Sequence, residues 1–453
     1  MMKNKRYQTT LATAAFSLLL CGCGLYKPYM RPAAIASQLE ETDTTTLRWR
    51  EVFSNPALQT LIDSVLVHNT DLRVSQLRIG EAEEQLRTTR LSLLPSVNLS
   101  ADASTADFST FATSLAGRAQ WQIDVFAGLT NATRKAKAAL MESEDYSRAV
   151  RTQLVADVAG LWYSLALLRQ QREVTAENVA LWAETIDKTT AMKEAGMVTD
   201  AALAQYEATY WQAKSSLTDY DYNIKLVENS LGRLLGDSQS LDDYGTLLAQ
   251  STALGGEQQE FGSESLAAMK QLDLSKMAHR PDVRMAEEQL MQAYYGTAIA
   301  RASLYPSLTL SGNGLTDLNF NSVATQVAAS VAQPVFNSGA NRARLRVAQL
   351  QQEEALMNFK QTLCDAALEL DDVYGKLRTA TEKSHSLAQQ VVSLERAAQS
   401  TNYLMEYGTA GTTYLDVLTA RRSLLSAQLA ELSNHYDELS AIISLYKAWG
   451  GDR

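Results

Sequence analysis

Cysteine and histidine are the side chains that could act as nucleophiles or bind a metal, and in this sequence they are few and scattered. In 453 residues the chain has three cysteines and four histidines, namely Cys21, Cys23, Cys364, His68, His279, His385 and His435. No histidine has a second ligand at the short, regular spacing of zinc sites. The sequence also contains no glycine-rich phosphate loop and no nucleophile elbow. We therefore expect no enzyme activity, no metal site and no cofactor.

The two N-terminal cysteines lie at the end of a secretion signal. A basic region and a short apolar run occupy residues 3–20, and this run is too short to span a bilayer. It ends in Leu20-Cys21-Gly22-Cys23, which resembles a bacterial lipobox because leucine stands three positions before Cys23 and a small residue directly before it. We expect residues 1–22 to be removed and Cys23 to carry acyl chains, since each buried CH₂ contributes about 0.8 kcal/mol to anchoring.

Two alternatives remain for this segment. Cys21 could carry the lipid, although leucine rather than a small residue precedes it, and an ordinary signal peptide would give a secreted protein. Gly24 follows Cys23, where lipoproteins retained in the inner membrane have aspartate. The outer membrane is therefore the expected location.

Composition and proline positions limit the fold. The net charge of −10 gives no basic surface for nucleic acid, and 46% hydrophobic residues are typical of a folded protein. No proline lies between Pro95 and Pro281 or after Pro334, so very long helices are possible. Cys364 lies on an apolar helical face in one of these stretches, and we expect it to be a buried, inert thiol.

The chain contains an internal duplication. Asp71-Leu72-Arg73 and Arg90-Leu91-Ser92-Leu93-Leu94-Pro95-Ser96 recur 211 residues later as Asp282-Val283-Arg284 and Arg301-Ala302-Ser303-Leu304-Tyr305-Pro306-Ser307. Further matches along the chain keep an offset of 210 to 212 residues. Such regular spacing indicates two repeats with few insertions between them.

Both repeats predict the same order of elements. A helix covers about 58–93 or 283–304 and ends before a proline. Two strands follow, and the second runs to about 126 or 336. Polar and apolar residues alternate along these strands, as in Gln120-Trp121-Gln122-Ile123, so one face is apolar and the other polar. This pattern suits a barrel with lipid outside and water inside.

A long helix then follows in each repeat. Its apolar residues recur every three or four positions: Leu154, Val158, Leu161, Leu165 and Leu168 in the first repeat, and Leu356, Phe359, Leu363, Ala366, Leu370, Val373 and Leu377 in the second. The same spacing returns later on that helix at Leu387, Val391 and Leu394. This heptad pattern is typical of coiled coils. Roughly sixty residues would make a helix on the order of 90 Å long. We expect it to end near Gly196 or Gly408, with a return helix to about 235 or 449.

The sequence therefore predicts five segments. They are a signal peptide (1–22), a lipidated N-terminal segment (23–57), a first repeat (58–235), a linker or equatorial segment (236–275) and a second repeat (276–453). Each repeat would contain a helix, a β-hairpin and a long helix pair.

The motifs in this order resemble the outer membrane factor family, the TolC-like channels, and in particular its OprM-like (NodT) lipoprotein branch. The resemblance is carried by Tyr26-Lys27-Pro28-Tyr29-Met30-Arg31-Pro32, Asn69-Thr70-Asp71-Leu72, Arg280-Pro281-Asp282-Val283-Arg284 and Tyr414-Leu415-Asp416-Val417-Leu418-Thr419-Ala420. It implies a mainly α fold with a small β part. Three subunits with four strands each would form one outer-membrane β-barrel, continuous with a long α-helical coiled-coil barrel in the periplasm. Four strands cannot close a barrel alone, and lipid does not tolerate open edges, so physical reasoning also requires oligomers.

The resemblance further implies a function and partners. The chain would be the outer-membrane channel subunit of a tripartite efflux pump, giving exported compounds a passive exit. It would form a homotrimer in outer-membrane lipid and work with a periplasmic adaptor protein and an inner-membrane pump of the RND type. A channel of the same fold for type I secretion or metal-ion efflux is the alternative. A periplasmic coiled-coil lipoprotein is less compatible with the paired strands.

The resemblance also implies a gate at the periplasmic tip. Asp416 matches an aspartate that forms a ring in some family members, although Thr419 stands where a second acidic residue is common. Asp200 is the corresponding candidate in the first repeat. Both aspartates could instead cap helices. The turns expected to dock the adaptor contain Gly196, Thr199, Gly408 and Gly411. Phe126 and Phe336 could anchor the protein at the membrane interface or pack beneath the barrel.

Overall fold

The computed structural model describes residues 26–36, 48–106, 110–236, 245, 274–317, 323–332, 338–407 and 413–451. The chain forms two compact units, each made of three stretches: 1–40, 74–147 and 281–364 in the first, and 41–73, 148–280 and 365–453 in the second. Cys23, the linker over 237–244 and 246–273, Phe336, Gly408 and Gly411 lie outside the described residues.

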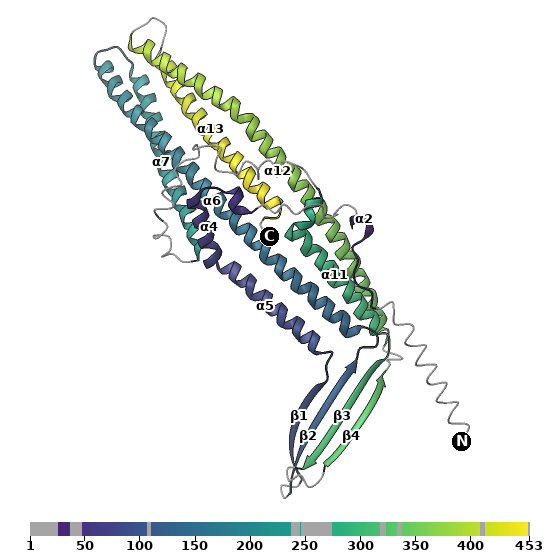
Figure 1. Cartoon of the computed structure of the whole chain (residues 1–453). Helices are drawn as coiled ribbons and strands as arrows, with labels where there is room; N and C mark the ends of the chain where they lie inside the picture. Colours follow the sequence, from purple (N-terminus) through teal and green to yellow (C-terminus); the bar gives the residue numbers. More distant parts are fainter. Residues whose placement is uncertain are drawn as a thin grey trace, which may run out of the picture. The chain divides into compact units, whose positions relative to one another are not determined.

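One order of elements occurs twice along the chain (Figure 1). The elements are α2 (Ala33–Ala36), α3 (Trp49–Val52), α4 (Pro56–His68), α5 (Thr70–Leu91), β1 (Ser96–Ala106), β2 (Thr110–Ile123), α6 (Gly128–Glu194), α7 (Asp200–Leu235), η2 (Leu274–His279), α11 (Pro281–Ala302), β3 (Ser307–Asp317), β4 (Val323–Ala332), α12 (Ala340–Glu406) and α13 (Tyr414–Ala448). Helix, two strands, long helix and return helix follow one another in both halves. The predicted mainly helical fold with a small β part is confirmed.

The first unit contains a four-stranded antiparallel sheet in the order β1-β2-β3-β4. Directly paired residues of an antiparallel sheet share a face. Val97 pairs with Ala119, and Trp121 pairs with Leu310, which in turn pairs with Ala329. These residues form an apolar face, and their polar neighbours along the strands lie on the opposite face. The apolar face is therefore continuous across all four strands.

The first predicted helix is interrupted. Instead of one helix over 58–93, α4 ends at His68 and α5 begins at Thr70. Asn69 causes the break, because its side-chain oxygen accepts a hydrogen bond from Leu72 N (3.1 Å) and its amide donates to Leu234 O (2.9 Å). A buried asparagine with these local bonds competes with the helical backbone pattern.

The core of the second unit surrounds α4 and the end of α13. Asn55 caps α4 by accepting hydrogen bonds from Ala57 N and Leu58 N, and Pro56 stands at the first helical position. Leu58, Leu61 and other apolar residues of α4 are fully buried. The rings of Phe53 and Tyr446 meet edge to face at 5.5 Å. The residues before and within α4 therefore hold the C-terminal helix in place.

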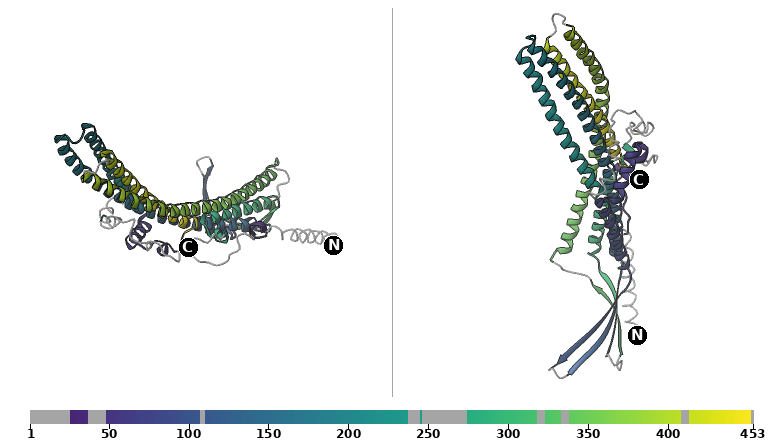
Figure 2. Two further views of the ribbon diagram at one scale, coloured as in Figure 1. Left: turned by 90° about the horizontal axis from the view of Figure 1, so that it is seen from above. Right: turned by 90° about the vertical axis from the view of Figure 1, so that its left-hand side faces the viewer.

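The long helices α6 and α12 each contain 67 residues. In Figures 1 and 2, α7 runs beside α6 and α13 beside α12. Most members of the predicted heptad seam are buried, including Val158, Leu165, Phe359 and Leu370, and the others are partly buried. In the described residues, no helix has a stretch both long enough and apolar enough to cross a bilayer.

The prediction for Cys364 is wrong, because this thiol is exposed. Phe359 and Ala366 belong to the buried seam of α12, whereas Cys364 lies about 100° around the helix from Leu363, since 3.6 residues make one turn. Cys364 instead continues an exposed apolar stripe formed by Val347, Leu350 and Met357, at the heptad spacing of 347, 350, 357 and 364.

Candidate functional site

The turn between α6 and α7 contains Gly196, Thr199 and Asp200. Gly196 has φ +76°, a left-handed conformation that ends α6 at little steric cost. Thr199 caps α7 by accepting a hydrogen bond from Ala202 N (3.3 Å). Asp200 is exposed and forms an ion pair with Lys193. The hydrogen bond and positive charge of Lys193 lower the pKa of Asp200, so the carboxylate is ionised at neutral pH.

The turn between α12 and α13 places Asp416 in a capping box. Asp416 Oδ2 accepts hydrogen bonds from the backbone N–H and the hydroxyl of Thr413, both at 2.7 Å, while Thr413 Oγ1 accepts one from Asp416 N (3.3 Å). These bonds, first the backbone and then the hydroxyl one, lower the pKa of Asp416. The carboxylate is therefore both a helix cap and a fixed negative charge at this turn.

Contacts in the second unit connect these two turns. The hydroxyl of Tyr206 on α7 donates to Tyr414 O at the start of α13 (3.1 Å). Trp182, Tyr206 and Leu418 form a buried cluster beneath the turns. Four helix ends, α6, α7, α12 and α13, thus meet at one end of the second unit, which we call the tip.

Arg421 is the residue at the tip that sequence reasoning missed. Its guanidinium lies 5.7 Å from the ring centre of Trp182, and it donates hydrogen bonds to Thr185 Oγ1 on α6 and Asn402 Oδ1 on α12, each at 3.0 Å. Burial lowers the pKa of Arg421. One side chain of α13 therefore bridges three helices, and only its proximity to the Tyr414–Ala420 motif could have suggested this role.

The tip also exposes large apolar side chains. The rings of Tyr403 on α12 and Tyr407 just after it are in contact in a tilted arrangement, with ring centres 4.4 Å apart, and both are more than half exposed. Met197 in the first turn and Leu415 at the start of α13 are exposed as well. Exposed apolar groups gathered at a helix end are typical of a contact surface.

The segment after the lipidation motif, residues 26–32, binds to the first unit as a strap. Tyr26 donates its hydroxyl to Asp124 O (2.6 Å), and Arg134 donates to Tyr26 O (2.9 Å). Arg31 makes a two-point contact with Glu287 at 2.8 and 2.6 Å. Because Asp124 directly follows β2, the strap begins where the sheet meets the helices.

Phe126 is packed inside the first unit and is not exposed as a membrane anchor would be. Its side chain is buried and stacks on Tyr305 with ring centres 4.8 Å apart. Asp124 nearby caps α6, accepting hydrogen bonds from Leu129 N (3.0 Å) and Thr130 N (2.7 Å). The strand-to-helix junction is therefore a fixed corner.

The contacts of Arg280 give a structural role to the first residue of the motif that opens the second repeat. Its side chain is buried in the second unit, where it donates to Ala448 O (2.7 Å) at the end of α13 and to Glu369 Oε2 (2.6 Å) on α12. It thereby satisfies a carbonyl that the end of a helix leaves unpaired.

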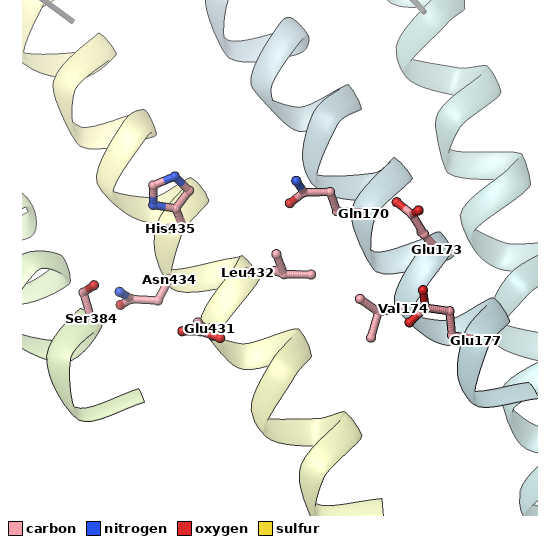
Figure 3. Close-up of a pocket in the computed structure, with 9 residues that line it drawn as sticks. All are labelled: Gln170, Glu173, Val174, Glu177, Ser384, Glu431, Leu432, Asn434 and His435. Atoms are coloured by element: carbon pink, nitrogen blue, oxygen red, sulfur yellow. The ribbon is translucent and has the colours of Figure 1, made fainter. Parts of the chain in front are cut away.

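A cavity of about 450 Å³ lies between α6, α12 and α13 in the second unit (Figure 3). Val174 and Leu432 point toward each other across it, and Asn434 donates to Ala380 O (2.9 Å). The lining residues are Gln170, Glu173, Val174, Glu177, Ser384, Glu431, Leu432, Asn434 and His435. Within the described part of the chain, no three His, Cys, Asp or Glu side chains are grouped to hold a metal ion.

Comparison with known proteins identifies the family. The profile of the outer membrane efflux protein family matches residues 61–237 and 275–451, and this chain therefore belongs to that family. The cation efflux system protein CusC of Escherichia coli K12 is 27% identical over 96% of this chain and 97% of its own length. The toluene efflux pump outer membrane protein TtgC of Pseudomonas putida is 27% identical (98% and 96%), and the probable outer membrane lipoprotein SilC of Salmonella typhimurium 25% (98% and 99%).

The fold agrees with this family. A crystal structure of CusC superposes on this chain with a TM-score of 0.79 at 25% identity, covering 94% of this chain and 99% of that one. The predicted resemblance is therefore confirmed, and the chain is an outer-membrane efflux channel protein rather than a member of an enzyme family.

Proposed function

We propose that this chain is the outer-membrane subunit of a tripartite efflux pump, in which it provides exported compounds with a passive, water-filled exit. The observation that carries this proposal is the four-stranded sheet with one apolar and one polar face. Val97, Leu99 and Val327 on the apolar face are each more than 70% exposed. Such a face is unfavourable in water but suits lipid, while the polar face suits an aqueous lumen.

The two edges of this sheet support a homotrimer. Among the strands that the structure describes, β1 pairs with β2 alone and β4 pairs with β3 alone. Unpaired edges are not tolerated in lipid, so β4 of one subunit pairs with β1 of the next. With four alternating strands in each subunit, that pairing is antiparallel, like the other three. We propose that three copies close the ring and that the exposed stripe of α12 faces a neighbouring subunit.

The strap supports a lipid anchor at Cys23. Tyr26 is held at the end of β2 and stands three residues after Cys23, so an acyl chain on Cys23 starts within about 10 Å of this corner. An anchor at this place enters the same membrane that receives the sheet. The name of SilC, an outer membrane lipoprotein, is consistent with the proposal.

The tip supports the gate and the docking site. Three copies of Asp416, and likewise of Asp200, would each make a ring of negative charge that favours cations. Tyr403, Tyr407 and Leu415 offer an apolar surface to a periplasmic adaptor, which in turn connects to an inner-membrane pump of the RND type. Relatives named for cation efflux and for toluene efflux are both 27% identical to this chain, so sequence identity at this level reflects the shared channel fold and does not indicate which compound is exported.

Reconstitution tests the proposal. The full-length, acylated protein is purified in detergent, sized by light scattering and then inserted into planar bilayers. We expect a trimer that conducts ions, with an N-terminal peptide whose mass shows acyl chains on Cys23. A stable monomer without conductance would contradict the proposal. A trimer acylated on Cys21 would contradict only the anchor assignment.

A further inference from the structure

Two carboxyl side chains are buried together between α6 and α11 in the first unit. Asp145 on α6 is 1% exposed and Glu288 on α11 is 2% exposed. A hydrogen bond joins their side chains. Two ionised carboxylates have no donor to offer, so this bond requires a proton on one of them.

The surrounding charges assign the proton to Glu288. Arg284 lies with Nε 2.9 Å from Asp145 Oδ2, which favours the charged form of Asp145. The charged groups that act on Glu288 are Asp145 and Glu142 from α6 and Arg284 from its own helix. Two of these three groups are negative. An arginine that already pairs with Asp145 cannot fully neutralise a second carboxylate.

Glu288 also has an oxygen without a partner. Its Oε2 is buried and makes no hydrogen bond. Burial in the first place, then the negative charge of Asp145 and the shared hydrogen bond, raise the pKa of Glu288 from 4.5 to about 9. An orphaned oxygen is less costly on a neutral acid than on a carboxylate, so the geometry and the charges agree.

The other repeat has no acids at the corresponding positions. By the repeat offsets, Leu77 corresponds to Glu288 and Ala355 to Asp145, whereas Arg73 corresponds to Arg284. Buried polar pairs are seldom more stable than apolar pairs of similar size. The acid pair is thus specific to the contact between α6 and α11, and what it adds to an apolar pair is the ability to titrate.

We propose that Asp145 and Glu288 form a proton-dependent joint between α6 and α11. While the shared proton is present, the two helices stay packed. Under alkaline conditions the proton is lost, and two adjacent carboxylates are then both charged in a buried site beside Arg284. Their repulsion loosens the packing of α11 against α6, so the joint makes this part of the channel sensitive to external pH.

The direction in which pH changes the stability of the joint follows from the proton that the native state binds. Between pH 4.5 and about 9, the native protein holds a proton on Glu288 that the unfolded chain releases. Stability from the joint is therefore complete below pH 4.5 and declines as the pH rises, until the native state also loses the proton near pH 9.

Thermal unfolding of the full-length protein in detergent tests this joint from pH 5 to pH 10. Glu288→Gln keeps the size and the hydrogen-bond donor of the protonated acid but cannot ionise. We expect its melting temperature to be close to that of wild type at pH 5 and increasingly higher as the pH rises. Glu144→Gln removes an exposed carboxylate of α6 and should follow wild type throughout. Parallel curves for wild type and Glu288→Gln would overturn the proposal.

A second measurement needs no variant and so covers the case in which Glu288→Gln does not fold. Infrared spectra of the wild-type protein should show the carbonyl stretch of a protonated carboxylic acid at pH 7, and that band should disappear by pH 10. A spectrum without the band at pH 7 would also refute the joint. The double change Asp145→Ala/Glu288→Leu, which copies the other repeat, should fold and lose both the band and the excess pH dependence.

Discussion

At the scale of single residues, Asp416 combines two roles that can be separated. Its carboxylate caps α13 through Thr413 and is also a charge at the tip. Asp416→Ala should raise single-channel conductance and remove block by divalent cations, whereas Thr413→Ala, which keeps the carboxylate, should leave the block in place. Because hydrogen bonds lower the pKa of Asp416, block in the wild-type channel should persist at pH 5. Bilayer recordings of the three proteins measure all these effects.

Thr413→Ala is the control for this prediction, because it disrupts the cap of α13 as Asp416→Ala does but keeps the carboxylate. Both substitutions remove the reciprocal bond between residues 413 and 416, so an effect of helix fraying on conductance would appear in both variants. Equal currents from Asp416→Ala, Thr413→Ala and wild type would show that Asp416 only caps the helix.

At the scale of secondary-structure elements, Arg280 holds the end of α13 against α12. Arg280→Gln removes its charged hydrogen bonds to Ala448 O and Glu369, which should cost about 2 kcal/mol. Local opening at the end of α13 should then make amide hydrogen exchange roughly 30-fold faster there. Arg378→Gln, which breaks an exposed pair with Glu382 on α12, is the matched control and should change exchange little. Unchanged exchange in Arg280→Gln would contradict this role.

At the scale of the whole molecule, Cys364 reports on assembly. If Cys23 is acylated and residues 1–22 are removed, Cys364 is the free thiol of the mature chain. It lies on the exposed apolar stripe with Val347, Leu350 and Met357, which we propose faces a neighbouring subunit. Maleimide labelling should therefore be slow in the trimer and fast after dissociation. A serine at an exposed position outside the stripe, Ser393→Cys in a Cys364→Ser background, should label fast in both states. Fast labelling of Cys364 in the intact trimer would place the interface elsewhere.

Much of this architecture was predictable from local patterns. Alternation along the strands predicted a sheet with two different faces, heptads predicted the two long helices, and a regular offset predicted two repeats. Residues 408–412 and the lipidation motif lie outside the described structure, so Gly408, Gly411 and Cys23 stay predictions. Gly196, Thr199, Asp200 and Asp416 lie at the two turns of the tip, where Thr199 and Asp416 cap helices and where we propose the gate.

Sequence alone determined the order and type of the elements, because the spacing of apolar residues among near neighbours differs between helices and strands. Tertiary structure decided what covers each face. Cys364 and Ala366 look equally apolar along the chain, yet only the packing of α12 shows that Ala366 is buried and Cys364 is exposed. The same holds for Arg421, which bridges three helices, and for Glu288, whose proton depends on Asp145, 143 positions away in the sequence. A periodic pattern states that a residue faces inward, but its charge and hydrogen bonds depend on partners that only the folded chain brings into contact.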